Sequence, residues 1–212
     1  MKKALILIGL LAPVALHAAT VYSDTTTDTG GTVFYSTGPF VQIGDRIALA
    51  GTDREATAAS AQFFAGAGSG TFDATLRFFN VGSPVGSQIG GSFTVTGNSI
   101  TSGNVAVVNW VSLGNLVLPT NVIFTVSVSN LSAGLDLGLT MFEPVTIGSS
   151  SNQFFITSTN GTTFLQSSQG NSQDNLYFSL TAVTTSGIPE PGTMLLTLLG
   201  IPVIALARKR IR

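Results

Sequence analysis

Apolar and polar residues alternate with a period of two along the middle of the chain. In residues 72–79, Phe72, Leu76 and Phe78 fall on one side of an extended segment, and Asp73 and Arg77 fall on the other. This alternation is typical of a β-strand that buries one face. The same pattern recurs in residues 122–129 and 176–182, and shorter strands are predicted at residues 32–36, 45–50, 58–65, 91–96, 104–112, 135–143 and 153–159.

Clusters of glycine, serine, asparagine and proline separate these segments, as turns do. They lie at residues 66–70, 82–84, 90–91, 97–98, 102–104, 148–151, 160–161 and 170–171. About ten strands without a long amphipathic helix predict an all-β body, an antiparallel β-sandwich or jelly roll. A β-helix is the alternative, but the sequence shows no fixed-period repeat. Residues 20–31 are polar with short side chains, which predicts a flexible arm or an edge strand outside the core.

The chain begins with the pattern of an export signal. Lys2 and Lys3 form a basic start, residues 4–16 are apolar, and Ala18 and Ala19 supply small side chains for signal peptidase. This order of basic, apolar and small residues is that of a secretory signal peptide. We therefore expect residues 1–19 to form a helical signal peptide that is cut after Ala18 or Ala19, and residues 20–183 to form the exported body.

The other end of the chain carries a second membrane signal. Residues 184–187 are a polar spacer, residues 188–191 contain two prolines that resist helix, and residues 192–207 are uncharged and apolar. In lipid such a run satisfies its backbone as a helix. At about 1.5 Å per residue this helix is roughly 24 Å long, which is short for a hydrocarbon core of about 30 Å.

A basic cluster follows the apolar run and sets its orientation. Basic residues favour the cytoplasmic side of the membrane, and this cluster consists of Arg208, Lys209, Arg210 and Arg212. The preceding body is therefore expected on the opposite side, held by a short transmembrane helix.

Residues 188–212, with the two prolines, the apolar run and the basic cluster, resemble the sorting signal of PEP-CTERM proteins of Gram-negative bacteria. The motif is Pro189, Glu190 and Pro191, preceded by Ile188 where the family usually has valine. The resemblance implies processing by signal peptidase and an exosortase, with the precursor held temporarily in the inner membrane. It also implies cleavage near the motif and delivery of the body to the cell surface or the exopolysaccharide matrix. Residues 46–93 and 174–180 are similar to β-sandwich bodies and last strands found in this family.

Charge and composition exclude several kinds of chemistry from the body. Between residues 20 and 187, three arginines stand against nine carboxylates, a formal balance of −6. Nucleic acid is therefore not an expected partner, because phosphate binding needs a basic surface. The chain has no cysteine, and its one histidine is His17 in the signal peptide. Catalysis through an imidazole or a thiol and zinc sites built on them are excluded, as are disulfides.

An enzyme built from this body would have to use carboxylates. Glycoside hydrolysis needs two of them facing a cleft, one with a raised pKa. Asp53 and Glu55 lie two residues apart, Asp73 begins a strand, and Glu143 follows an apolar segment. The alternative is that these are solvated or turn residues, with Asp53 and Glu55 paired to Arg54 or Arg46. Nothing in the sequence singles out one pair, so no catalytic residue is assigned.

Calcium is the one cofactor that the sequence suggests. Ca²⁺ takes six to eight oxygen ligands, which Asp, Asn and loop carbonyls supply. Asp24 with Asp28 form one candidate set, and Asn171 with Asp174 and Asn175 form another. No EF-hand or nonapeptide pattern is present, and ordinary Asx turns are the alternative.

Binding of sugar would need an exposed aromatic ring. The rings other than phenylalanine are those of Trp110, Tyr22, Tyr35 and Tyr177. Trp110 lies in a strand with apolar residues on both faces, so a buried ring is the alternative to a sugar platform.

The sequence thus favours an exported, non-enzymatic β-sandwich protein. Its expected role is structural, at the cell surface or in a biofilm matrix with exopolysaccharide. A carbohydrate-binding or adhesive module is the alternative, followed by a carboxylate-based glycoside hydrolase.

Overall fold

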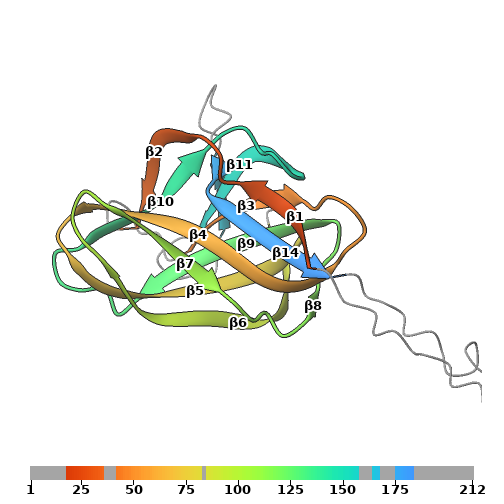
Figure 1. The fold of residues 1–212 in the computed structure, drawn as a ribbon, viewed down its shortest axis with the longest axis horizontal. Helices are drawn as coiled ribbons and strands as arrows, with labels where there is room; N and C mark the ends of the chain where they lie inside the picture. The colour runs from red at the N-terminus through yellow and green to blue at the C-terminus, as the bar shows by residue number, and fades with distance from the viewer. Residues whose placement is uncertain (1–17, 36–41, 83–84, 158–163, 168–174, 184–212) are drawn as a thin grey trace, which may run out of the picture.

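The computed structural model describes residues 18–35, 42–82, 85–157, 164–167 and 175–183, and its regular structure there is all β-strand (Figure 1). The prediction of an all-β body is confirmed. Within these ranges there is no helix with the length and apolarity to cross a bilayer. The helices predicted at the two ends lie outside the described residues.

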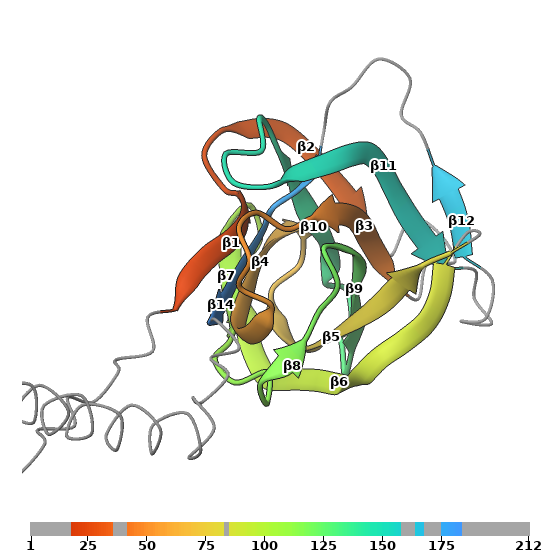
Figure 2. The same ribbon diagram turned by 90° about the vertical axis from the view of Figure 1, so that its right-hand side faces the viewer.

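Two antiparallel sheets make up the described body. The first contains, in spatial order, β1 (Ala19–Asp24), β14 (Phe178–Val183), β4 (Glu55–Ala67), β10 (Asp136–Phe142) and β13 (Asn175–Leu176). Three further strands pair with this sheet. Two of them pair with β4, namely β7 (Val105–Trp110) and β8 (Leu116–Val117), and β2 (Asp28–Phe34) pairs with β10. The second contains β12 (Phe164–Ser167), β11 (Ser149–Thr157), β3 (Ile43–Ala48), β9 (Asn121–Ser129), β5 (Gly70–Val81) and β6 (Val85–Ile100). Figure 2 shows the sheets facing each other around the core in a sandwich-like arrangement.

The core fills the space between the two sheets, and it is held by aromatic rings from both. Phe124 of β9 stacks on Phe178 of β14, with ring centroids 3.8 Å apart and an angle of 8° between the planes. Phe63 of β4 packs against Phe72 of β5, with centroids 4.9 Å apart. The alternation predicted for β5 is confirmed, because its apolar side chains at 72, 74, 76 and 78 are fully buried.

Two hydrogen bonds also cross between the sheets. The hydroxyl of Tyr35, just after β2, donates to the carbonyl of Val126 in β9 at 2.9 Å. The indole N–H of Trp110 in β7 donates to the carbonyl of Phe93 in β6, also at 2.9 Å. Both donors belong to buried rings, so neither is left without an acceptor in the core.

The strand β9 is buried on both of its faces, which the simple alternation does not predict. Val122, Phe124 and Val126 face the core, while Ile123 packs on the other face with Phe79 in a small second cluster. Burial of both faces fits the position of β9 between β3 and β5 in the second sheet.

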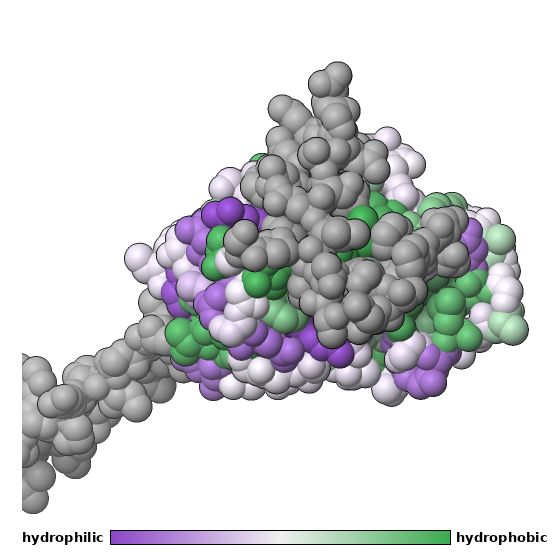
Figure 3. Space-filling model, turned by 180° about the vertical axis from the view of Figure 1, so that it is seen from behind, coloured by the Kyte–Doolittle hydropathy of each residue, from purple (hydrophilic) through white to green (hydrophobic). Residues whose placement is uncertain are grey.

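On the side of the molecule turned away from the viewer in Figure 1, apolar residues lie among polar ones (Figure 3).

Two of the predicted turns are instead irregularities within the long strand β6. The register between β5 and β6 shifts near Gly90 and near Gly97, whose φ angles are 65° and 69°. Glycine adopts such angles at little cost, so one or two extra residues fit into the strand as bulges. The amide of Gly97 donates to Asp73 Oδ1 at 2.8 Å, which anchors one bulge to β5.

The N-terminal segment at residues 20–31 is also different from the prediction. It forms most of β1 and the start of β2, and Val21 and Tyr22 are buried in the core. Its β1 part is an edge strand, as one alternative held, but it is not outside the core. Alternation does not reveal this, because the four consecutive residues 21–24 of β1 are all buried.

Candidate functional site

Two acidic side chains lie in the core beside the aromatic stack. Asp24 is directly opposite Phe178 in the pairing of β1 with β14, and Asp45 is opposite Phe124 in the pairing of β3 with β9. Residues opposite each other on paired strands share a face of the sheet. Asp24 and Asp45 are 0% and 1% exposed, so each sheet sends one carboxyl into the interior.

The carboxyl of Asp45 is well satisfied by hydrogen bonds. Its Oδ1 accepts from the backbone N–H of Arg46 at 2.6 Å, and its Oδ2 accepts from the hydroxyl of Ser150 at 2.9 Å. A hydrogen bond from the backbone N–H of Leu176 in β13 also favours the ionised form of this carboxyl. Burial nevertheless dominates and raises the pKa of Asp45 to about 7.

The carboxyl of Asp24 is in a different position. In the described part of the chain, neither of its oxygens has a partner at hydrogen-bonding distance and angle, although both are buried. Burial and, to a smaller extent, the charge of Glu143 raise the pKa of Asp24 to about 6, although the side-chain amide of Asn175 opposes the rise. A buried carboxylate without well-placed donors is costly in free energy.

The strand ends explain why Glu143 and Asn175 lie close to Asp24. Phe142, the last residue of β10, pairs with Asn175 at the start of β13. The backbone N–H of Glu143 then donates to the carbonyl of Thr27 at 2.9 Å, just beyond β1. The ends of β1, β10 and β13 therefore meet at one place.

A tyrosine completes this group. The hydroxyl of Tyr22 is buried, and it too has no hydrogen-bond partner within the described residues. Burial and the nearby charges of Asp45 and Asp24 raise its pKa. We call the set Tyr22, Asp24, Asp45, Glu143 and Asn175 the acidic corner.

The acidic corner offers only oxygen ligands to a metal ion. Among the described residues, no group of three or more Asp, Glu, His or Cys side chains is placed to hold a metal. An ion bound here would therefore need neutral oxygens in addition to two carboxylates.

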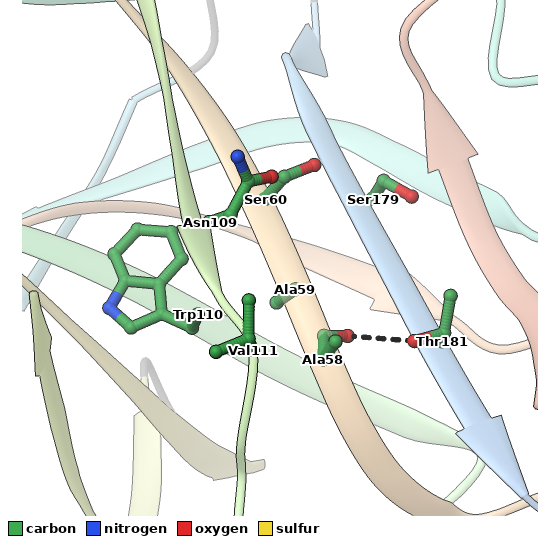
Figure 4. Close-up of a pocket in the computed structure, with 8 residues that line it drawn as sticks. All are labelled: Ala58, Ala59, Ser60, Asn109, Trp110, Val111, Ser179 and Thr181. Carbon is green, nitrogen blue, oxygen red and sulfur yellow. Dashed lines mark hydrogen bonds between the residues drawn. The ribbon is translucent and has the colours of Figure 1, made fainter.

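A second candidate site is a shallow groove on the outer face of the first sheet (Figure 4). It has a volume of about 290 Å³ and is lined by Ala58, Ala59, Ser60, Asn109, Trp110, Val111, Ser179 and Thr181. Hydroxyl groups come from β4 and β14, and the Asn109 amide comes from β7. The hydroxyl of Thr181 donates to the carbonyl of Ala58 at 3.3 Å. The groove thus presents uncharged hydrogen-bonding groups on a floor of small side chains.

The structure does not support Trp110 as a sugar platform. The residue is only 2% exposed, and its N–H is used inside the core. In Figure 4 its ring extends away from Ser60 and Ser179. The buried alternative is the correct one, because Trp110 occupies an inward position of β7 while Val111, next to it, is 83% exposed.

The predicted calcium ligands are only partly brought together. Asp28 is exposed at the start of β2, where its Oδ1 accepts from the N–H of Gly30 at 2.7 Å, so it does not join buried Asp24. The structure instead places Asp24 near Asn175, one residue from each candidate set. Asn171 and Asp174 lie outside the described residues.

None of the carboxylates considered for hydrolysis lines the groove in Figure 4. Asp73 accepts from Gly97 and from the amide of Asn130 at 2.6 Å, and these bonds lower its pKa. Asp53 and Glu55 are half-buried. The side chain of Arg54 donates to nearby backbone carbonyls and Thr120.

Sequence reasoning missed Asp45 and the inward position of Tyr22. A signal for Asp45 was present, because Ile43, Asp45 and Ile47 alternate and therefore share one face of β3. An acid in line with two isoleucines indicates a buried carboxyl.

No protein-family model matches the chain, and comparisons with curated proteins and with solved structures find no match either. The functional proposals below therefore rest on the residues of this chain.

The acidic corner predicts that the protein loses stability as the pH rises. Folding raises the pKa of Asp24 and Asp45 from about 4 to about 6 and 7, so the native state binds protons more tightly than the unfolded chain. The free energy of unfolding should therefore fall between pH 4 and pH 7. In metal-free buffer we expect Asp24→Asn to reduce this fall by on the order of 2 kcal/mol and to be more stable than the wild type at pH 8.

Urea unfolding of the full chain at pH 5 and pH 8 measures this. Asp28→Asn is the matched control, because that carboxyl is exposed. An unchanged pH dependence in Asp24→Asn would show that Asp24 is not a destabilising buried acid.

Proposed function

We propose that this protein is an exported structural component of the cell surface or of an exopolysaccharide matrix, sorted through a PEP-CTERM signal. The body is proposed as a jelly-roll-like sandwich between a signal-peptide helix and a short transmembrane helix. It is not proposed as an enzyme, since residues 18–212 contain no imidazole or thiol.

One feature of the fold carries this proposal. The first strand of the body, β1, lies beside its last strand, β14, with Ala19 opposite Ala182 (Figure 1). The two ends of the body therefore leave it from the same place. A body with this arrangement can stand on one side of a membrane while both flanking signals engage that membrane.

The sequence of the C-terminal segment supports the sorting step. The motif at residues 189–191 precedes the uncharged run, and the basic cluster follows it. This order gives the segment a stop on the cytoplasmic side and an accessible motif on the opposite side. Cleavage at the motif would release the body, because the spacer at residues 184–187 lies before it.

Intact mass of the surface protein tests the proposal. In a strain with exosortase we expect a mature form that lacks the signal peptide and the basic cluster. Without exosortase, or with Pro189→Ala and Glu190→Gln together, the cluster should be retained. Thr185→Ala in the spacer is the control, and it should be processed normally. Retention of Arg212 in the wild type in both strains would refute the proposed sorting.

The groove in Figure 4 favours a carbohydrate-binding module as a second candidate function. Sugars are bound through their hydroxyl groups, and Ser60, Asn109, Ser179 and Thr181 line this groove without a charged neighbour among its lining residues. The absence of an exposed ring among those residues favours weak binding, which suits a protein that meets a repeating polymer many times.

A glycan array with the full chain in detergent tests this second function. We expect binding to a neutral polysaccharide that falls about tenfold in Asn109→Ala, because a hydrogen bond from this exposed amide to the bound sugar would be worth roughly 1.4 kcal/mol. Gln88→Ala, an exposed amide in β6 of the other sheet, should bind as the wild type does. Equal binding by both variants would exclude the groove.

A further inference from the structure

We propose that the acidic corner is a calcium site in which Asp24, Glu143 and the side-chain oxygen of Asn175 hold the ion. This site lies in the body and does not depend on the sorting signal or on sugar binding.

The first argument is that Asp24 needs a positive partner. Its two oxygens are buried, and within the described residues neither has a donor at hydrogen-bonding distance and angle, although the side-chain amide of Asn175 acts on the carboxyl. The buried hydroxyl of Tyr22 likewise has no partner at that distance and angle. An ionised carboxyl in such surroundings must be paired, coordinated to a metal or protonated. The charges of Glu143 and Asp45 make the need for a cation greater.

Within the described residues, none of the arginines is placed to supply this cation. The body contains three arginines and no lysine. Arg54 donates to carbonyls near residue 51, and Arg77 donates to Ser92 and Ser127. Arg46 is next to Asp45 in β3, so its side chain points to the opposite face of the sheet. A metal ion that pairs with ionised Asp24 would therefore come from solution, since no described arginine does so.

The ligand types select calcium among the common metal ions. Ca²⁺ accepts six to eight oxygen ligands in an irregular arrangement. This site offers two carboxylates and an amide oxygen, to which backbone carbonyls and water can be added. Zinc and copper favour nitrogen or sulfur ligands, which this site lacks. Mg²⁺ requires a strict octahedron and keeps most of its water. Asp45 contributes charge more than ligation, because both of its oxygens already accept hydrogen bonds.

The position of the site indicates what calcium would do. Asp24 belongs to β1, Glu143 follows β10, and Asn175 begins β13. An ion held by all three would join three strand ends and remove the unpaired charge from the core. Calcium would therefore stabilise the folded body outside the cell, where the ion is abundant, and less so inside.

Thermal unfolding of the full chain in detergent tests the site. At pH 8, about 5 mM calcium chloride should raise Tm by roughly 3–6 °C over EDTA, as expected for a site with the affinity of extracellular modules. The same concentration of magnesium should have a much smaller effect. At pH 5 the calcium shift should shrink, because protons compete for Asp24.

Two variants make the test specific. Asp24→Asn should fold, gain Tm in EDTA at pH 8 and lose the calcium shift, since it keeps the shape and removes the charge. Asp28→Asn, which alters the exposed acid at the start of β2, should keep the full shift. Calorimetric titration should give one calcium per wild-type chain.

Three results would overturn the proposal. They are no calcium shift in the wild type at pH 8, an equal shift in Asp24→Asn, or an equal shift with magnesium. The first would mean that Asp24 is simply protonated in the core, and the other two would mean that calcium acts elsewhere on the acidic surface. None of them bears on sorting or on glycan binding, which are measured independently.

Discussion

The contact between Phe124 and Phe178 is the interaction on which the rest of this structure depends. These rings belong to different sheets and stack 3.8 Å apart, and Tyr22 and Phe78 pack against Phe178 around them. The chain has no cysteine, so no disulfide joins the sheets. Burial of apolar surface must therefore hold the two sheets together.

The acidic corner places acidic side chains inside this apolar core. Asp24 and Asp45 lie opposite the same two phenylalanines in their strand pairs, so the carboxyls and the stack share one region of the core. A core selected only for stability would place apolar side chains there. The free energy that these acids cost is consistent with a role that depends on solution conditions, such as pH or the concentration of calcium.

The sequence predicts the strands better than it predicts the site. Alternation in β5 and β14 identifies both the strands and their buried faces, because each has one apolar side. It fails for β1, where residues 21–24 are all buried and no alternation marks an inward face. The approach of Asp24 to Asn175 also could not be predicted, since it depends on the pairing of strands that are about 150 residues apart in the chain. The groove in Figure 4 likewise requires three neighbouring strands to be known.

A double-mutant cycle at Phe124 and Phe178 tests the central claim most directly. Leucine at either position removes the ring and keeps an apolar side chain in the core. Urea unfolding of the full chain in EDTA measures the change in the free energy of unfolding. The account predicts a loss of about 1–3 kcal/mol for each variant and a coupling energy of at least about 0.5 kcal/mol between them. Val111→Ala, at an exposed position, should change stability by less than about 0.5 kcal/mol. Additive effects, or losses no larger than that of Val111→Ala, would contradict the view that this stack joins the two sheets.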